Sequence, residues 1–357
     1  MHSRAANAGP TESASWSVTI ATSETAARSD LRPSRRESHL VVCIPCLNEE
    51  ETVARVVDAV PRTVAGVDRI DVLVIDDGST DRTVEVAERA GAIVRRHGAN
   101  LGLGRAFRTA IRVALELGAD VVVNIDGDGQ FDAADIPAIA GPVLRGEAEM
   151  ATGSRFLRSD FVPEMPTIKR WGNLWVTWIV RLLTGKRFRD VSCGFRAFSR
   201  EALLRMNLFG SFTYTQETFL DLVFKEMSIV EIPVRVRGVR EFGASRVASS
   251  IPRYAWRSLE IMLRAFIGYR PFVFFSTLAA AFFAVGIPLL VFLLVHYLRS
   301  GGFSPHIWAG FVGGSFCFLG ISTLVTGIVG DMLVRMRLNQ EQILYRQKAE
   351  RLDRKRE

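Results

Sequence analysis

A short apolar run that ends in two carboxylates constrains this sequence more than any other stretch. Residues 121–131 are V-V-V-N-I-D-G-D-G-Q-F, and the β-branched residues predict a buried strand. Alternate residues of an extended segment point the same way, so Asp126 and Asp128, with Gln130 behind them, are expected to face one hard divalent cation. The competing interpretation is an ordinary solvated Asp-Gly turn after a strand. The rest of the sequence decides between the two.

Before this stretch the sequence alternates between predicted strands and predicted helices. Apolar residues 39–45 and 71–75 each end in a polar turn that begins a helix. A third strand at 92–95 leads through a glycine-rich loop into a helix at 105–117. This alternation predicts a parallel α/β sheet whose ligand site lies at the carboxyl ends of the strands. The expected helix caps are Asn48 for the first helix and Ser79, Thr80 or Asp81 for the second.

Four motifs in this region carry a family resemblance. They are I-P-C-L-N-E-E at 44–50, D-D-G-S-T-D-R-T at 76–83, N-L-G-L-G-R-A at 100–106 and D-G-D-G-Q at 126–130. In this order they resemble family-2 glycosyltransferases, whose GT-A fold is a Rossmann-like nucleotide-sugar-binding domain. Each motif follows a predicted strand, so all four are expected at one cleft. A dinucleotide-binding Rossmann domain is the alternative within this architecture. In such a domain the glycine-rich loop follows the first strand, whereas in this sequence it follows the third.

The resemblance implies a nucleotide-sugar donor, UDP- or GDP-linked, and a Mg²⁺ or Mn²⁺ cofactor. The ion would act as a Lewis acid for the diphosphate leaving group. A UDP-sugar is preferred because such donors are prevalent for bacterial lipid carriers, and GDP-mannose is the alternative. The implied metal ligands are Asp126, Asp128 and Gln130, with Asp128 also assigned to catalysis. The implied nucleotide-sugar residues are Pro45, Asn48, Glu49, Asp76, Asp77, Gly78, Gly104 and Asp126.

Later segments resemble the polyprenyl-phosphate glycosyltransferases, which include the dolichol-phosphate mannosyltransferases. The segments are A-T-G-S-R-F at 151–156, D-V-S-C-G-F-R-A-F at 190–198 and R-E-F-G-A-S-R-V at 240–247, and the resemblance covers roughly 40–269. It implies that the acceptor phosphate is bound by Arg155, Arg170, Ser245 and Arg246. Many relatives have lysine where this chain has Arg246. The resemblance therefore implies a positive charge at this position but not the geometry of its hydrogen bonds. A solvated surface charge is the alternative for each arginine.

The resemblance further implies one in-line displacement that inverts the anomeric centre. A phosphate monoester, with a second pKa of about 6, is already an anionic nucleophile near neutral pH. A dedicated general base is therefore not required. Asp190 and Glu217 are the carboxylates to test for that role, and a structural role in the acceptor loop is the alternative.

The last third of the chain predicts membrane attachment. Two apolar segments are each long enough to cross a hydrocarbon core of about 30 Å, and arginines flank the pair while the connection between them is nearly neutral. The positive-inside rule then places the catalytic domain and both termini in the cytoplasm, with the protein integral to the inner or plasma membrane. The expected parts are a disordered tail at 1–38, the catalytic domain at 39–250, an interfacial amphipathic helix at 251–270, transmembrane helices at 271–298 and 307–334, and a basic cytoplasmic tail at 335–357.

Composition agrees with a membrane partner. The chain is 48% hydrophobic with a formal charge of +7, and much of the basic excess lies near the apolar C-terminal segments, which favours an anionic bilayer over nucleic acid. The four cysteines lack the spacing of a zinc site or a disulfide framework, which indicates a reducing compartment. Homo-oligomerisation through the hairpin is a further hypothesis, since four glycines allow close helix packing. They are Gly310, Gly314, Gly327 and Gly330.

Two alternative functions stay open. The first is a processive polysaccharide synthase of the same fold, although the Q-x-x-R-W motif of those enzymes is missing and two spans are few for a translocating channel. The second is a non-catalytic membrane scaffold that kept a glycosyltransferase-like domain. The intact pair Asp126 and Asp128 argues against the scaffold.

Overall fold

The computed structural model describes residues 37–162, 167–208, 214–237 and 251–354. The predicted tail at 1–38 falls almost entirely outside these ranges, as do Ser245 and Arg246.

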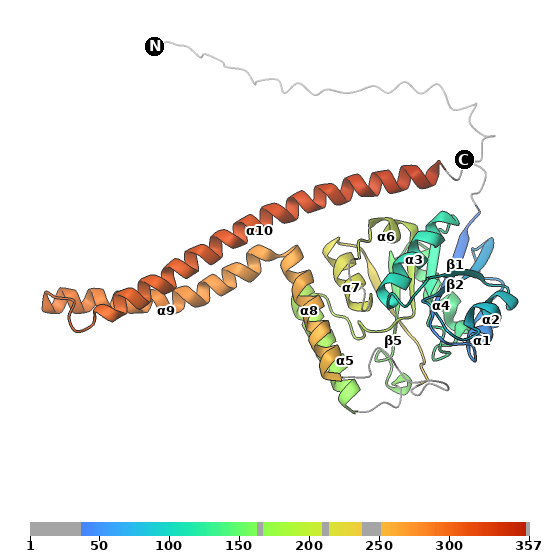
Figure 1. The fold of residues 1–357 in the computed structure, drawn as a ribbon, viewed down its shortest axis with the longest axis horizontal. Helices are drawn as coiled ribbons and strands as arrows, with labels where there is room; N and C mark the ends of the chain where they lie inside the picture. The colour runs from blue at the N-terminus through green and yellow to red at the C-terminus, as the bar shows by residue number, and fades with distance from the viewer. Residues whose placement is uncertain (1–36, 163–166, 209–213, 238–250, 355–357) are drawn as a thin grey trace, which may run out of the picture. The chain divides into compact units, whose positions relative to one another are not determined.

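A seven-stranded sheet forms the centre of the domain (Figure 1), in the order β3-β2-β1-β4-β6-β5-β7. The four strands from β3 to β4 are parallel, as predicted, but β6 runs antiparallel to both of its neighbours, so the sheet is mixed. After β5 the chain forms a helix and a loop and then enters the sheet in the reverse direction. The strands are β1 His39–Cys46, β2 Arg69–Asp76, β3 Ile93–Arg96, β4 Val121–Asn124, β5 Met150–Ser154, β6 Arg196–Ser199 and β7 Ile229–Pro233.

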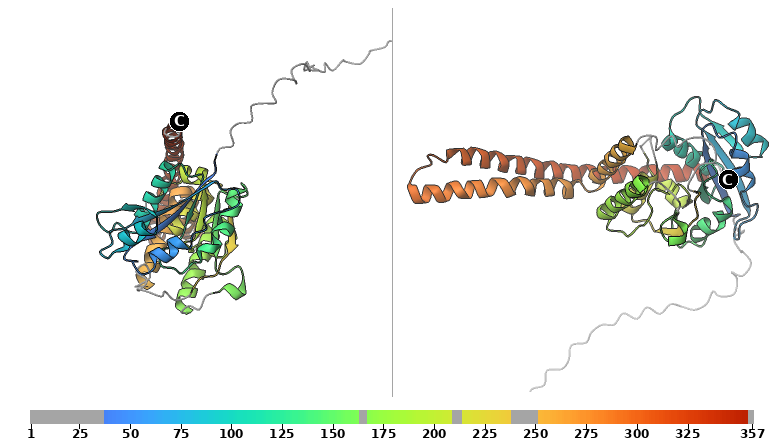
Figure 2. Two further views of the ribbon diagram at one scale, coloured as in Figure 1. Left: turned by 90° about the vertical axis from the view of Figure 1, so that its right-hand side faces the viewer. Right: turned by 90° about the horizontal axis from the view of Figure 1, so that it is seen from below.

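Helices cover both faces of the sheet (Figures 1 and 2). Strand β1 is buried along its whole length, and its side chains alternate between two core clusters. Val41 and Cys43 pack on one side with α3, while Val42 and Ile44 pack on the other with α1 and α4. The helices are α1 Val53–Asp58, α2 Thr83–Arg89, α3 Leu103–Glu116, α4 Ile136–Leu144, α5 Thr167–Thr184, α6 Arg200–Arg205, α7 Thr215–Phe224, α8 Ile251–Tyr269, α9 Pro271–Ser300 and α10 Ile307–Asp353, with 3₁₀ turns at Ala133–Asp135 and Ser159–Phe161.

Pro45 lies inside β1, a central strand, where proline is normally excluded because it has no N–H to donate. The pairing of β1 with β4 ends at Cys43, whose carbonyl accepts from Ile125 N at 3.0 Å. The backbone groups of residues two apart in a strand face the same side, so those of Pro45 face the β4 side, like those of Cys43. Because β4 has already ended there, the missing N–H of Pro45 costs no hydrogen bond. The two strands separate at this point, and the opening is the edge at which the predicted site residues lie.

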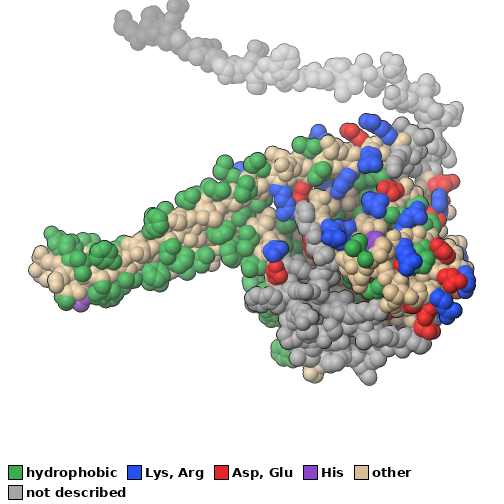
Figure 3. Space-filling view, in the orientation of Figure 1, with side chains coloured by type: hydrophobic (Ala, Val, Ile, Leu, Met, Phe, Trp, Pro, Cys, Tyr) green, Lys and Arg blue, Asp and Glu red, His purple; other side chains and the backbone are tan. Residues whose placement is uncertain are grey.

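Helices α9 and α10 pack side by side (Figure 2), and each is long and apolar enough to cross a membrane. Apolar side chains face outward along this pair (Figure 3), and Leu298 and Phe311 are each 73% exposed. The glycines proposed to mediate oligomerisation mostly pack between α9 and α10 themselves. A Cβ on Gly310 would lie 2.7 Å from Leu293, and one on Gly330 would lie 2.8 Å from Pro271, whereas Gly314 faces open space.

The predicted cytoplasmic tail is not separate from the second span. Helix α10 continues without a break to Asp353, and its C-terminal part packs on the domain. Tyr345 Oη donates to Glu201 at 2.9 Å, and Lys348 Nζ donates to Asn207 Oδ1 at 3.3 Å. Tyr345, Ala349 and Leu352 form an apolar stripe at helical spacing that packs against the core. The stripe was not predicted from the sequence because most of the residues around it are charged.

A substitution at Gly78 can test the backbone geometry at the end of β2. Its φ is +83°, and a Cβ there would lie 2.5 Å from the carbonyl carbon of Ala99. Gly91 has a similar φ of +86° with nothing within 4 Å, so Gly91→Ala isolates the left-handed penalty of about 1–2 kcal/mol. We expect Gly78→Ala to lower the melting temperature of the purified protein well beyond the shift of Gly91→Ala. Equal shifts would show that the close approach to Ala99 is not limiting.

Candidate active site

Side-chain hydrogen bonds join the loops after β1 and β2. Asn48 does not cap α1, which begins at Val53; its backbone is left-handed with φ +50°, and its Oδ1 accepts from Thr80 N at 2.7 Å. Ser79 Oγ accepts from Asn48 N at 2.8 Å, so Ser79 and Thr80 hold the first loop instead of capping α2. Of the predicted caps, Asp81 alone contacts the start of α2, accepting from Thr83 N at 3.0 Å.

Two buried aspartates at the end of β2, Asp76 and Asp77, hold the neighbouring loops by hydrogen bonds. Asp76 is fully buried, accepts from Ser79 N and lies 3.2 Å from Arg96 Nε. Asp77 accepts from Leu101 N at 3.0 Å and Gly102 N at 2.8 Å, and it lies 2.7 Å from His97. Asp77 therefore fixes the glycine-rich loop that leads into α3.

The acidic turn differs in conformation from the prediction. Strand β4 ends at Asn124, and the backbone turns through the two glycines, with φ +71° at Gly129. The alternation of an extended strand therefore does not orient Asp126 and Asp128. Asp128 is 5% exposed, and its Oδ1 accepts from Gln130 N at 3.0 Å. The Gln130 amide donates to Arg237 O at 3.0 Å, which ties the turn to the last described residue before 238–250.

Gly127 lies close to two side chains, one at the end of β1 and one in the loop after it. A Cβ at this position would lie 2.4 Å from Glu49 Oε2 and 2.6 Å from Cys46 Sγ. Thr52 Oγ1 also donates to the Gly127 carbonyl at 2.7 Å. Glu49 therefore points at the acidic turn from the β1 loop. Burial and the Glu49 carboxylate raise the pKa of Cys46, so this thiol stays protonated.

Asp126 is half-buried against the loop that precedes β6. A Cβ on Gly194 would lie 2.9 Å from Asp126 Oδ2, so the absence of a side chain there makes room for the carboxylate. Asn124 Nδ2 donates to Tyr214 Oη at 2.7 Å and to Gly194 O at 3.2 Å, and Tyr214 Oη donates to Gly194 O at 3.1 Å. Burial and the Asp126 charge raise the pKa of Tyr214, which keeps this phenol a donor.

A buried arginine, Arg196, fixes the same loop. Its side chain is 0% exposed and donates to Cys193 O at 2.8 Å, Val191 O at 2.9 Å and Thr215 O at 2.8 Å. Its guanidinium also lies 4.7 Å from the centre of the Phe219 ring. Burial lowers the pKa of Arg196, and nearby acidic groups oppose the shift. Arg196 lies in the segment D-V-S-C-G-F-R-A-F, but its role could not be predicted because no local pattern indicates its burial.

Arg155 and Asp190 form a two-pronged ion pair at the other end of this loop. Arg155 Nε lies 2.7 Å from Asp190 Oδ2, and Nη2 lies 2.9 Å from Oδ1. Asp190 is fully buried, whereas the Arg155 side chain is 18% exposed. Burial raises the pKa of Asp190, but the adjacent Arg155 outweighs it, so the pKa is lowered. Asp190 is ionised and committed to Arg155, which favours the structural alternative over a proton acceptor.

The remaining predicted residues are less closely grouped. Gly104 is buried in the first turn of α3, and Glu217 is half-exposed in the first turn of α7. Arg170 is exposed on α5, beside Trp171, which is 73% exposed. Ser245 and Arg246 lie outside the described residues.

The acidic turn fits a hard divalent cation by its donor chemistry. Asp126 and Asp128 supply carboxylate oxygens, and Mg²⁺ is commonly held by one or two carboxylates plus substrate phosphates. In the described part of the chain, no group of three or more His, Cys, Asp or Glu residues is placed to hold a metal. Two carboxylates are within the number that Mg²⁺ commonly takes from a protein when a diphosphate and water supply its other ligands.

Comparison with known proteins agrees with this arrangement. The glycosyl transferase family 2 model matches residues 41–206, which extend from β1 to the residue after α6. The chain is 31% identical over 181 residues to UDP-N-acetylglucosamine–dolichyl-phosphate N-acetylglucosaminyltransferase of Methanococcus voltae, covering 46% of this chain and 70% of that relative. It is 28% identical over 235 residues to polyprenol monophosphomannose synthase of Mycolicibacterium smegmatis, covering 63% and 86%.

A solved structure shares the fold. Glucosyl-3-phosphoglycerate synthase from Mycobacterium tuberculosis, crystallised with Mn²⁺, uridine diphosphate and glucosyl-3-phosphoglycerate, aligns with a TM-score of 0.51 at 23% identity, covering 64% of this chain and 80% of that one. The resemblance noted in the sequence is confirmed, and the chain belongs to glycosyltransferase family 2, with a GT-A-like domain.

Proposed function

We propose that this chain is a membrane-bound enzyme that transfers one hexose-type sugar from a UDP- or GDP-sugar to a polyprenyl phosphate at the cytoplasmic surface, with inversion. The observation that carries the proposal is a single loop between Asp190 and Gly194. At one end this loop holds Arg155, and at the other it contacts Asp126. One segment therefore contacts both the cation proposed for the acceptor phosphate and a carboxylate proposed for the metal-bound diphosphate.

The donor half of the proposal rests on the acidic turn. Asp126 and Asp128 would hold Mg²⁺ or Mn²⁺, which supplies Lewis-acid stabilisation to the departing diphosphate. The two loops joined through Asn48 and Ser79 would form the wall for the base and ribose. Among relatives, the Methanococcus voltae enzyme is named for a UDP-sugar.

The acceptor half rests on Arg155. A planar guanidinium can meet phosphate oxygens with paired hydrogen bonds, and Asp190 fixes its orientation. The two relatives are named for a dolichyl phosphate and a polyprenol product, both of which carry a long prenyl chain. Ser245 and Arg246, which lie outside the described residues, are also proposed for the acceptor phosphate on the family resemblance alone. Because the acceptor phosphate is itself an anionic nucleophile, Glu217 is proposed as a positioning residue and not as an obligatory base.

Membrane attachment supports a lipid acceptor. Besides the apolar helices α9 and α10, the domain exposes an apolar face on α5. Exposed residues on that face recur at helical spacing, and tryptophan favours the membrane-water interface. They are Trp171, Leu174, Trp175, Trp178 and Leu182.

The acidic turn is tested by Asp126→Asn and Asp128→Asn. Each variant keeps the side-chain shape but removes a charge from the ion, whose stabilisation is worth several kcal/mol, so transfer should fall about a hundredfold or more. The assay measures labelled sugar in organic-extractable lipid, with Mg²⁺ or Mn²⁺ and a panel of donors, and EDTA should abolish it. The matched control is Asp58→Asn, an exposed carboxylate on α1. Full activity in both site variants would reject the metal site.

The ion pair between Arg155 and Asp190 is tested by Arg155→Lys, which keeps the charge but loses the paired contacts. We expect KM for polyprenyl phosphate to rise about tenfold to a hundredfold, the loss expected for charged hydrogen bonds, with KM for the donor unchanged. The matched control is Arg158→Lys, because Arg158 forms an exposed ion pair with Asp160. An equal rise in both KM values would contradict a specific acceptor role.

Asp190→Asn gives a pH signature for the same pair. The folded pKa of Asp190 is lowered, so its stabilising contribution is present above its unfolded value of about 3.9 and is lost as pH falls through the folded value. The melting temperature of the variant should lie below that of the parent from pH 6 to 8, and the gap should close below about pH 4. A gap that widens on acidification would contradict this assignment.

The orientation is tested by cysteine labelling in intact cells. Three native cysteines are buried and the fourth, Cys317, lies inside the apolar part of α10. Gly302→Cys, in the open connection between α9 and α10, should react with an impermeant maleimide from outside. Gln347→Cys, exposed near the end of α10, should react only after permeabilisation. The reverse pattern would overturn the topology.

A further inference from the structure

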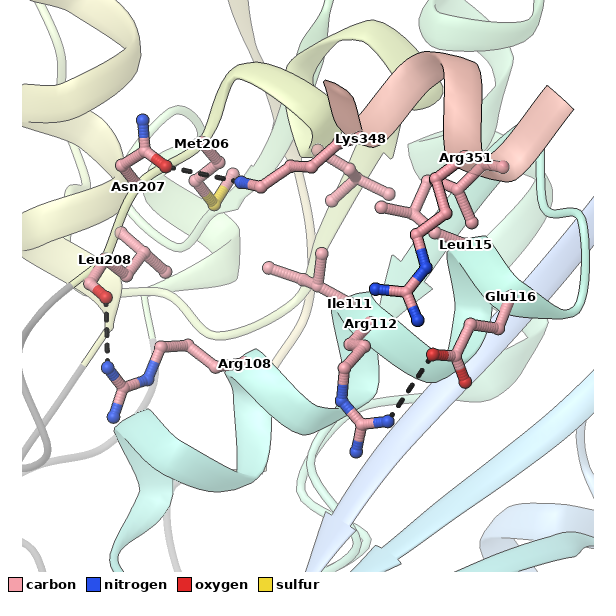
Figure 4. Close-up of a pocket in the computed structure, with 12 residues that line it drawn as sticks. Arg108, Ile111, Arg112, Leu115, Glu116, Met206, Asn207, Leu208, Lys348 and Arg351 are labelled. Carbon is pink, nitrogen blue, oxygen red and sulfur yellow. Dashed lines mark hydrogen bonds and ion pairs between the residues drawn. The ribbon is translucent and has the colours of Figure 1, made fainter. Parts of the chain in front are cut away.

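A pocket of 380 Å³ lies where α3, α6 and α10 meet (Figure 4). Its volume is within the range of small-molecule sites. Helix α3 begins at Leu103, beside the loop that Asp77 fixes, and residues further along it, from Arg108 to Glu116, line the pocket. At about 1.5 Å per residue, Arg108 lies roughly 8 Å and Arg112 roughly 13 Å further along the helix than Leu103. The pocket is therefore separate from the candidate active site.

The interior of the pocket is apolar. Ile111 and Leu115 contribute from α3, Leu203 from α6, Met206 from the turn after it and Leu352 from α10. Figure 4 shows Ile111 directed toward the space below α10. Such a lining favours a hydrocarbon chain over water.

Cationic side chains surround this interior. Arg108 and Arg112 come from α3, and Lys348 and Arg351 come from α10 (Figure 4). Among the described lining residues, Glu116 is the one carboxylate, and it lies 3.5 Å from Arg112. Four positive charges therefore face one negative charge at the rim.

The rim cations are oriented by the protein. Arg108 Nη1 donates to Leu208 O at 3.1 Å, and Lys348 Nζ donates to Asn207 Oδ1 at 3.3 Å. Burial and the Lys225 charge lower the pKa of Lys348, and the Glu341 and Asp221 carboxylates oppose this shift. Like charges gathered at an apolar opening repel one another, and a bound anion relieves that repulsion.

We propose that this pocket binds an anionic amphiphile, with a phosphate or carboxylate head at Arg112 and Arg351 and a short apolar chain over Ile111 and Leu115. Because α3 and α10 line the pocket from opposite sides, the ligand would stabilise the contact between α10 and the catalytic domain. This site is independent of the proposed sugar transfer.

Three probes separate the parts of this chemistry, using the full chain in nanodiscs of zwitterionic lipid. Hexyl phosphate supplies head and chain, inorganic phosphate supplies the head alone, and hexanol supplies the chain alone. We expect hexyl phosphate to raise the melting temperature saturably, because a ligand that binds only the folded state stabilises it. The other two should give little shift at equal concentration. Equal shifts from inorganic and hexyl phosphate would overturn the apolar part of the site.

Variants locate the binding. Arg351→Gln should weaken hexyl phosphate binding about tenfold, the effect of losing one charged hydrogen bond, as measured by calorimetric titration. The matched control is Arg346→Gln, an exposed arginine on α10 that does not line the pocket. Ile111→Phe, which fills the interior without changing charge, should also weaken binding. Unchanged affinity in both Arg351→Gln and Ile111→Phe would overturn the proposal.

A further arm distinguishes the source of the ligand. In nanodiscs that contain phosphatidylglycerol, a membrane headgroup would raise the melting temperature without hexyl phosphate, and the rise would require Arg351. A soluble amphiphile as the source predicts no such rise and a full response to added hexyl phosphate. No Arg351-dependent shift with either would remove the site.

Discussion

The buried guanidinium of Arg196 is the interaction on which the site depends. It is fully enclosed, yet its donors are met by the carbonyls of Val191, Cys193 and Thr215, because a buried charge without hydrogen bonds would be very costly. Those carbonyls belong to two segments, the loop before β6 and the start of α7. The loop in turn places Gly194 against Asp126. The hydrogen bonds of Arg196 therefore help to position the acidic turn.

Helix α7 connects this arrangement to the apolar helices. Its other end carries Asp221 and Lys225, which lie 2.9 Å apart, and Lys225 lies 3.1 Å from Glu341 on α10. Tyr269 of α8 donates to Asp221, and Arg337 of α10 lies 2.8 Å from Glu341. Burial raises the pKa of Asp221, and Lys225 opposes the shift. One short helix therefore contacts the loop before β6 at its start and helices α8 and α10 at its end.

The fold class and the placement of the motifs could be predicted because each motif follows a strand in the chain. Strand direction is harder: β6 resembles the other strands in sequence, and its reversal depends on the connection from β5 through α5. The conformation of the acidic turn was wrong in the prediction because the strand ends at Asn124, two residues before Asp126. The roles of Arg196 and Tyr214 depend on contacts between segments distant in the chain, which no local pattern encodes. The apolar stripe at Tyr345, Ala349 and Leu352 was present in the sequence, but its docking partner was not visible.

The pairing of Arg155 with Asp190 suggests why an arginine stands at this position. A guanidinium has five N–H donors in one plane, and Asp190 engages two of them along one edge. Lysine has three N–H donors on one nitrogen at the end of a flexible stem, so a carboxylate contact would not fix the direction of its other donors. With arginine, the buried carboxylate sets the orientation of the plane while the group as a whole stays cationic and reaches solvent. An anionic acceptor can then meet a preoriented cation, and less side-chain entropy is lost on binding than with a mobile side chain.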